Sequence, residues 1–295
     1  MISQYAQQLR DGLIRDVLDN TPIALKRKHW EDSVRGQSTP PGVNAHYLNL
    51  GGVPCLLCVS EQAESDKTIV YFHGGGLVEG SVETHRIWTC RLALYTGCRV
   101  LSVQYKLAPE HPYPAAVEDA LSVCNALAAS EAFTGSFCVG ADSTGCILGL
   151  LALLELKSNN TNKPDCAFLL SPSIDLTFSG PSIKTNASLD PFVSLDVLRH
   201  YSELYADGRD MSDPCISPLF ADLKDLPPIL LLVDDHEILF DDTTRLVRKI
   251  IDAGGKAKLH VTHGLWHVWP IWGDFPESET ALNVISQHIS QSMSD

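Results

Sequence analysis

Short apolar runs alternate with helical patterns along most of this 295-residue chain. Runs of β-branched and apolar residues indicate buried strands, which we expect at 68–72, 99–105, 136–139, 166–170 and 229–233. Helical patterns lie between them, at 86–95, 115–129, 143–157 and 241–253. This alternation predicts an α/β fold, in which helices cover both faces of a mostly parallel central sheet.

Two segments interrupt the alternation. Residues 1 to about 40 carry two amphipathic helical patterns, and residues from about 175 to 222 form a connection rich in Pro, Ser and Asp with a helix-like stretch at 193–205. A long insertion in a compact domain is usually a lid or a binding element. We therefore expect N-terminal cap helices in 1–45, a main α/β domain in 46–174 and 223–295, and a cap insertion in 175–222.

Charge and hydropathy exclude several classes of partner. The formal charge of −14 argues against nucleic acid, because phosphate binding needs clustered Lys and Arg, and the 22 basic residues form no long run. The first 20 residues lack the apolar core of a secretory signal. The longest apolar stretch, 146–154, is much shorter than the roughly 20 residues of a membrane span. We therefore expect a cytoplasmic protein without a membrane span.

The cysteines also favour a cytoplasmic protein. Nine cysteines, an odd number without a framework, favour reduced thiols. Cys55 and Cys58 form a Cys-x-x-Cys motif, but they lie in a β-like run with no second ligand pair nearby. Because structural zinc needs four ligands, we expect no metal site.

A run of three glycines follows the first predicted strand, in His73-Gly74-Gly75-Gly76. Consecutive glycines normally mark backbone that adopts positive φ or approaches another group closely. In acyl transfer that group is the oxyanion of a tetrahedral intermediate, which needs preorganised N–H donors. A plain tight turn is the alternative, but the preceding strand and histidine favour the oxyanion loop.

The segment 140–145, Gly-Ala-Asp-Ser-Thr-Gly, leaves a predicted strand and enters an apolar helix. This is the context of a nucleophile elbow, in which the residues two before and two after the serine must be small. Gly145 meets that requirement, whereas Ala141 departs from the strict G-x-S-x-G pattern. Ser143 is therefore the candidate nucleophile, and the alternative is a serine that merely caps the helix.

A serine nucleophile needs a base and an acid, which follow it in that fold in the order serine, acid, histidine. Of the histidines after the last acidic cluster, His267 lies in a Trp-rich loop behind a predicted strand at 256–261, and His263 is the reserve candidate. The acid should end the strand at 229–233. Spacing alone does not choose among the first three carboxylates there, Asp234, Asp235 and Glu237.

These motifs closely resemble the hormone-sensitive lipase family of α/β-hydrolases, its microbial esterase branch in particular. Further matching strings lie at 80–81, 105–119, 171–177 and 226–228. The resemblance implies an α/β-hydrolase fold with a helical cap, hydrolysis of a small-molecule carboxylic ester with short to medium acyl chains, and no cofactor. It also implies a homodimer through the edge strand at 256–261.

Residue by residue, the resemblance assigns the remaining roles. The stretch 237–241 is similar to the family's acid-x-Leu-x-Asp signature, which makes Glu237 the acid and Asp241 a supporting residue. The oxyanion donors are then the backbone N–H groups of Gly75, Gly76 and Thr144. His73 holds the loop that contains Gly74.

Two residues depart from the family's pattern. Family members with Asp before the nucleophile usually have Asp as the acid, whereas this chain pairs Asp142 with Glu237. Cys146 stands where Gly is common. Neither departure removes a catalytic group.

The cap insertion supplies candidate substrate-binding residues, which are also ordinary helix-core residues in the alternative interpretation: Phe178, Phe192, Leu198, Tyr201 and Tyr205. Two other functions stay open at this point. One is amide hydrolysis or acyl transfer on the same triad, since fold and triad do not set the acceptor. The other is a non-catalytic ligand-binding protein on this scaffold, although such proteins lack the complete triad that this chain retains.

Overall fold

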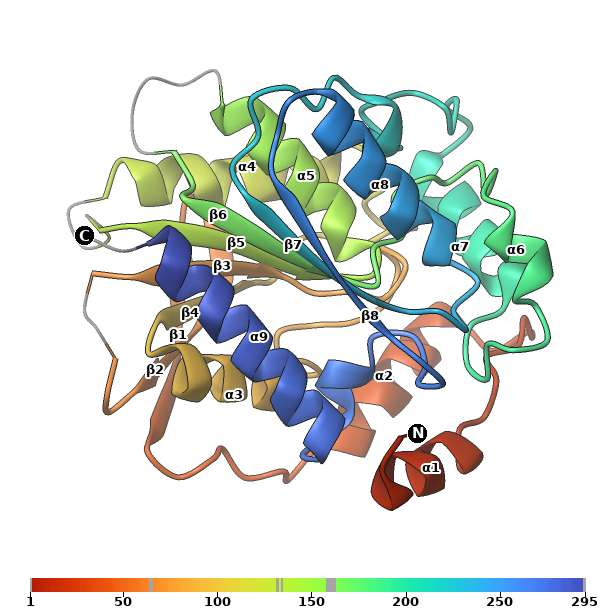
Figure 1. Cartoon of the computed structure of the whole chain (residues 1–295), viewed down its shortest axis with the longest axis horizontal. Coiled ribbons are helices and arrows are strands. Elements are labelled where there is room, and N and C mark those ends of the chain that lie inside the picture. Colours follow the sequence, from red (N-terminus) through yellow and green to blue (C-terminus); the bar gives the residue numbers. More distant parts are fainter. Residues whose placement is uncertain (1, 64–65, 131–132, 134, 158–162, 294–295) are drawn as a thin grey trace.

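One sheet of eight strands organises the part of the chain that the computed structural model describes, residues 2–63, 66–130, 133, 135–157 and 163–293. The strand order is β1-β2-β4-β3-β5-β6-β7-β8 (Figure 1). The strands are β1 Val43–Leu50, β2 Val53–Ser60, β3 Thr68–Phe72, β4 Arg99–Val103, β5 Phe137–Asp142, β6 Cys166–Leu170, β7 Ile229–Asp234 and β8 Ala257–Thr262. β1 and β2 pair antiparallel, as do β2 and β4, and every other pairing is parallel.

Helices cover both faces of this sheet. The described helices are α1 Gln4–Asp11, α2 Ile23–Val34, α3 Arg86–Thr96, α4 Ala115–Ala128, α5 Gly145–Leu156, α6 Ser182–Thr185, α7 Leu195–Ala206, α8 Phe240–Asp252 and α9 Pro276–Ser292, with short 3-10 turns at Pro218–Phe220 and Trp269–Trp272. Figure 1 shows α4, α5 and α8 on one face and α3 and α9 on the other. The prediction of a mostly parallel sheet between two helical layers is confirmed.

The core therefore has two parts, one on each side of the sheet. Successive side chains of a strand point to opposite faces, so β3 sends Val70 and Phe72 into one cluster and Ile69 and Tyr71 into the other. The same rule separates Cys55 from Cys58, three positions apart on β2, into different clusters. Two cysteines on opposite faces of one strand cannot ligate the same ion.

The predicted elements match this architecture to within a few residues. β3 and β6 have the expected bounds, whereas β5 extends to Asp142 and so reaches the candidate nucleophile. β1 and α9 were not among the predicted elements, whereas β2 covers the β-like run around Cys55 and Cys58. β1 is buried only at Val43, and its apolar residues are interrupted by Asn and His, which leaves its signal weak. β1 also crosses the predicted boundary at residue 45, so a division there would cut a strand.

Both segments that interrupt the alternation lie beside the carboxyl ends of the parallel strands. Figure 1 shows α1 and α2, from the N-terminal segment, and α6 and α7, from the insertion, gathered on that side of the sheet. The Arg27 side chain on α2 donates to the carbonyl of Val78 at 2.7 Å. The backbone N–H of Asp16 donates to the carbonyl of Phe192 at 2.9 Å, which joins the two segments. None of the described helices has the length and apolarity that crossing a membrane requires.

Candidate active site

Ser143 occupies a sharp turn between β5 and α5. Its φ of +50° lies in the left-handed region, which a non-glycine residue enters only where the surrounding structure holds it. A Cβ on Gly145 would lie 2.3 Å from the carbonyl oxygen of Phe72, so only glycine fits there. Ala141, in contrast, is the fifth residue of β5 and sits in the core with ordinary backbone. The elbow thus needs its second glycine, and alanine fits at the position of the first.

His267 links Ser143 to Glu237. His267 Nε2 lies 2.9 Å from Ser143 Oγ, and His267 Nδ1 lies 2.8 Å from Glu237 Oε2. All three side chains are buried, with Glu237 fully inaccessible. The structure therefore brings together the three residues that the sequence singled out, although 124 positions separate Ser143 from His267.

The second oxygen of Glu237 is held as firmly as the first. Glu237 Oε1 accepts from Ser171 Oγ at 2.7 Å and from the backbone N–H of Asp234 at 2.8 Å. Ser171 Oγ in turn accepts from the backbone N–H of Val268, beside the candidate base. These donors orient the carboxylate toward His267.

The charge of Glu237 makes His267 accept a proton more readily. Burial by itself lowers the pKa of His267, but the hydrogen bond and the charge of Glu237 outweigh it and raise the pKa above its ordinary value. Burial raises the pKa of Glu237, against the opposing effect of His267. His267 is therefore a stronger base than an isolated imidazole.

The other two carboxylates at the end of β7 have different partners. Asp234 accepts from the backbone N–H groups of Gly264 and Leu265 at 3.2 and 2.9 Å and from Thr262 Oγ1 at 2.8 Å, so it ties down the loop that leads to His267. Asp235 pairs at 2.8 Å with the reserve candidate His263, whose side chain is 78% exposed. Of the three carboxylates, Glu237 is the one that contacts the buried histidine.

Asp241 and its neighbour Asp242 anchor the same region. Asp241 Oδ2 accepts from the backbone N–H of Ser182 at 2.6 Å, and Ser182 Oγ donates to the carbonyl of Ile238 at 2.7 Å. Asp242 is buried and accepts from two backbone N–H groups, those of Ile174 and Asp175. Burial raises the pKa of Asp242 to about 7. These contacts fix the start of α8 directly behind Glu237.

The three glycines after β3 form a turn against the nucleophile. A Cβ on Gly74 would lie 2.3 Å from Asp142 Oδ2 and 2.9 Å from Ser143 Cβ, which explains a glycine at that position. Gly75 and Gly76 adopt φ values of +116° and +70°. Within the described residues, the backbone N–H groups of Gly75, Gly76 and Thr144 donate to no other protein atom. The turn that packs on Ser143 through Gly74 thus carries two amides without another partner, and Thr144 adds a third directly after Ser143.

A buried polar network supports this turn from behind. The carbonyl of His73 accepts from Tyr105 Oη at 2.6 Å, and the His73 ring stacks on Tyr105 with a centroid distance of 4.3 Å. Burial lowers the pKa of His73 to about 3, so its ring is neutral. His73 therefore holds the loop through packing and backbone contacts.

Asp142 belongs to the same network. Its Oδ1 accepts from Tyr71 Oη at 2.7 Å and lies 3.5 Å from His85 Nε2. Burial by itself raises the pKa of Asp142, but His85 and Tyr71 outweigh it and keep the pKa below its ordinary value. Sequence reasoning did not single out His85, and it included Ser171 only as the start of the matching string 171–177, without a role.

Comparisons with known proteins agree with this geometry. Residues 69–271 match a family model described as the alpha/beta hydrolase fold. An esterase of Acinetobacter venetianus is 35% identical over 231 residues, which cover 78% of this chain and 76% of that protein. An acetyl-hydrolase of Streptomyces hygroscopicus is 33% identical over 222 residues, covering 75% of this chain and 74% of that protein.

A solved structure extends the likeness to almost the whole chain. The crystal structure of an esterase from the bacterial hormone-sensitive lipase family superposes with a TM-score of 0.93 at 32% identity, covering 99% of this chain and all of that one. The chain belongs to the hormone-sensitive lipase family of α/β-hydrolases. It is thereby a carboxylic ester hydrolase of the serine carboxylesterase type.

The two departures of this hydrolase from its family's pattern fit the structure. Asp142 points away from His267 to Tyr71 and His85, so it does not compete with Glu237 for the imidazole. Cys146 is fully buried, and its Sγ lies 3.8 Å from the carbonyl oxygen of Leu170. Burial raises the pKa of this thiol, which keeps it protonated.

The candidate substrate-binding residues of the cap pack against one core cluster. Tyr201 on α7 lies against Gly76, because a Cβ on that glycine would be 2.3 Å from Tyr201 Cδ2. Phe192 contacts Trp272 edge-on, and Phe178 and Tyr205 are buried with Tyr201 in the same core cluster. Leu198 packs against the same core cluster. Tyr201 therefore packs directly on the glycine turn.

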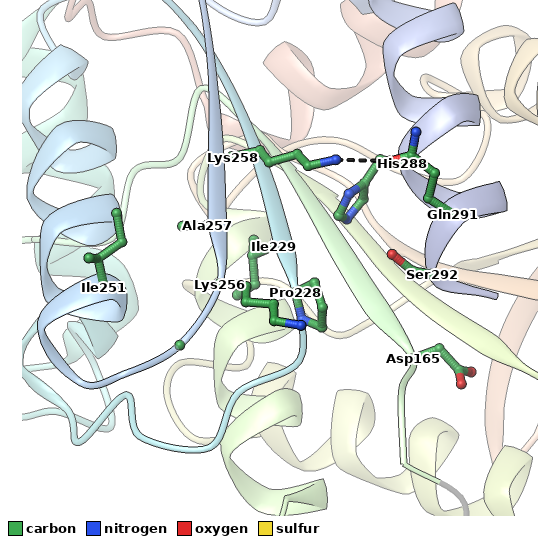
Figure 2. A pocket seen from close by; sticks show the side chains of 11 residues that line it. Asp165, Pro228, Ile229, Ile251, Lys256, Ala257, Lys258, His288, Gln291 and Ser292 are labelled. Atoms are coloured by element: carbon green, nitrogen blue, oxygen red, sulfur yellow. Dashed lines mark hydrogen bonds between the residues drawn. The ribbon is translucent and has the colours of Figure 1, made fainter. Parts of the chain in front are cut away.

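A cavity of about 620 Å³ lies at the other end of the sheet (Figure 2). Its lining includes Pro228 and Ile229 at the start of β7, Lys256 and Lys258 at the start of β8, and His288 on α9. The amino ends of these strands are remote from Ser143, which follows the carboxyl end of β5. The predicted homodimer through β8, an edge strand of this sheet, stays a prediction.

Proposed function

We propose that this hydrolase cleaves carboxylic esters of small molecules with Ser143 as nucleophile, His267 as general base and Glu237 as the acid that orients the base. The observation that carries the proposal is the continuous chain of contacts from Ser143 Oγ to His267 at 2.9 Å and on to Glu237 at 2.8 Å. A nucleophile, a base and an orienting group within hydrogen-bond reach are the signature of covalent acyl transfer.

The acylation step follows from these positions. His267 Nε2 takes the proton of Ser143 Oγ while that oxygen attacks the ester carbonyl carbon and forms a tetrahedral intermediate. Glu237 keeps the other imidazole proton on Nδ1 and stabilises the imidazolium. The N–H groups of Gly75, Gly76 and Thr144, which have no other partner among the described residues, hold the oxyanion.

The intermediate then collapses and releases the alcohol. His267 donates its Nε2 proton to the departing alkoxide oxygen, which leaves an acyl group on Ser143 Oγ. A water molecule gives a proton to His267 and attacks the acyl carbon, and collapse of the second intermediate returns that proton to Ser143. Every proton is transferred through His267 Nε2, and the cycle consumes one ester and one water molecule.

Short to medium acyl chains are the proposed substrates. The burial of the proposed catalytic residues supports this choice, because a site with little exposed surface favours a small substrate. Ser143 is 8% exposed and His267 is 4% exposed. The name of the Streptomyces acetyl-hydrolase points to a small acyl group in that relative. Amide hydrolysis and transfer to another acceptor would require the same residues, so they are outcomes of the assay.

The test measures turnover of p-nitrophenyl acetate and p-nitrophenyl butyrate by the wild type and by Ser143→Ala. We expect turnover by the wild type and its loss by at least about 10³-fold in the variant, since residual catalysis comes only from binding and the oxyanion hole. Ser290→Ala, an exposed serine on α9, is the matched control and should keep wild-type activity. Activity that survives Ser143→Ala would contradict the proposal.

A further inference from the structure

Tyr201 reaches from the cap to the glycine turn. A Cβ on Gly76 would lie 2.3 Å from Tyr201 Cδ2 and 3.1 Å from Tyr201 Cβ, so the side chain packs directly on this glycine. The ring is 6% exposed and projects from the middle of α7. It therefore occupies space immediately above one of the proposed oxyanion donors.

A carboxylate of the same turn fixes the position of that ring. Tyr201 Oη donates a hydrogen bond to Glu79 Oε1. The backbone N–H of Glu79 donates to the carbonyl of Gly75 at 2.7 Å, and a Cβ on Gly75 would lie 2.3 Å from the Glu79 carbonyl oxygen. Glu79 thus closes the glycine turn with its backbone and holds the tyrosine with its side chain.

The turn itself has little freedom to move away from the ring. Arg27 on α2 donates to the carbonyl of Val78 at 2.7 Å, and the backbone N–H of Ala108 donates to the carbonyl of Leu77 at 3.0 Å. Leu77 also has a positive φ of 59°, which fits only one local conformation of the turn. A substrate chain that needs the space above Gly76 must therefore displace the tyrosine.

We propose that Tyr201, held in place by Glu79, limits the length of the substrate chain that can lie over Gly76 and so makes this hydrolase selective for short-chain esters. Tyr201 is the specificity-determining residue, and Glu79 is a positioning residue that acts through it. The inference rests on the proposed function, because it takes the Gly76 amide as an oxyanion donor.

Chain-length selectivity should change differently when the Tyr201 ring is removed and when only its hydrogen bond to Glu79 is removed. Removal of the ring opens the space, whereas removal of the phenol hydroxyl leaves a ring that a longer chain can push aside. A glutamine at position 79 keeps an oxygen that can accept from Tyr201 Oη, but an alanine does not. Glu79→Gln should therefore preserve the selectivity that Glu79→Ala loses.

The experiment compares two ratios of kcat/KM in each variant, p-nitrophenyl acetate over p-nitrophenyl octanoate for the acyl side and ethyl acetate over octyl acetate for the alcohol side. The variants are Tyr201→Ala, Tyr201→Phe, Glu79→Ala and Glu79→Gln. Tyr47→Phe is the matched control, because Tyr47 also donates to a glutamate, Glu83, but is 62% exposed on β1. Each ratio is independent of the fraction of folded enzyme in the preparation.

We expect Tyr201→Ala to shift at least one ratio toward the long chain by about tenfold or more, the scale on which a pocket wall discriminates by chain size. Tyr201→Phe and Glu79→Ala should give smaller shifts in the same direction, and Glu79→Gln and Tyr47→Phe should match the wild type. A change below about threefold in both ratios for Tyr201→Ala would overturn the proposal. Absence of ester turnover by the wild type would instead overturn the proposed function.

Discussion

Replacement of Glu237 by glutamine tests how the base is oriented. Glu237 Oε1 accepts from Ser171 Oγ at 2.7 Å and from the backbone N–H of Asp234 at 2.8 Å. A backbone N–H cannot become an acceptor, so the amide oxygen of Gln must take this place. The amide nitrogen then faces His267 Nδ1, where the carboxylate oxygen lay at 2.8 Å.

This arrangement forces the wrong tautomer on the base. An N–H donor opposite Nδ1 requires an unprotonated Nδ1, so the single proton of neutral His267 moves to Nε2. Nε2 lies 2.9 Å from Ser143 Oγ and could no longer accept the serine proton. An acid-to-amide change with this effect lowers kcat by about 10⁴-fold in a serine triad, which corresponds to about 5 kcal/mol of activation free energy.

The assay is steady-state hydrolysis of p-nitrophenyl butyrate by Glu237→Gln and by Asp235→Asn. Asp235 pairs with the exposed His263, so its variant should retain nearly full activity. The thermal unfolding midpoint of each variant shows whether the fold is intact. A folded Glu237→Gln within about tenfold of wild-type kcat would refute the tautomer argument. A large loss confined to Asp235→Asn would move the acid to that position.

Three further predictions concern the base, the elbow and the start of α8. Because Glu237 raises the pKa of His267, wild-type kcat/KM should fall as the pH drops through a value above the ordinary histidine pKa of 6.5; a midpoint below 6.5 would contradict this. Gly145→Ala places a Cβ 2.3 Å from the Phe72 carbonyl oxygen, so it should abolish activity or folding, whereas Ala141→Gly should keep both. Asp242 has a folded pKa of about 7 against an ordinary 3.8, so stability should fall by up to about 4 kcal/mol as the pH rises from about 4 to 7. Urea unfolding should show that fall in the wild type but not in Asp242→Asn.

The sequence predicted the parts of the site that lie within local motifs. Ser143 and the glycine turn each follow a strand directly, and the backbone geometry there demands small residues, so the pattern is visible in a few letters. Ala141 shows the limit of the pattern, because only the environment of each position reveals that Gly145 is required and that Ala141 is acceptable.

Residues that join the site from distant segments were harder to predict. The choice of Glu237 over Asp234 and Asp235 depended on a family signature, since three carboxylates at the end of one strand have the same local pattern. Contacts across the fold distinguish them, and sequence spacing carries no information about those contacts. Glu79 and the role of Ser171 were missed for the same reason, because each residue acts through a partner far away in the chain.

β1 was missed for a different physical reason, whereas β2 is the largely buried apolar run around Cys55 and Cys58. β1 pairs antiparallel with β2 at the edge of the sheet, where half of its residues are exposed and no continuous apolar run is needed. The central parallel strands are buried on both faces and therefore carry the continuous apolar runs that sequence patterns detect.

Covalent labelling tests the central claim most directly. Diethyl p-nitrophenyl phosphate transfers a diethylphosphoryl group to an activated serine oxygen and releases p-nitrophenol, and the adduct cannot be hydrolysed readily. Mass spectrometry of the intact protein and of its peptides should find one such group, on Ser143, with a parallel loss of esterase activity. Ser143→Ala should remain unlabelled. Inactivation without modification of Ser143, or labelling at another residue, would contradict the account.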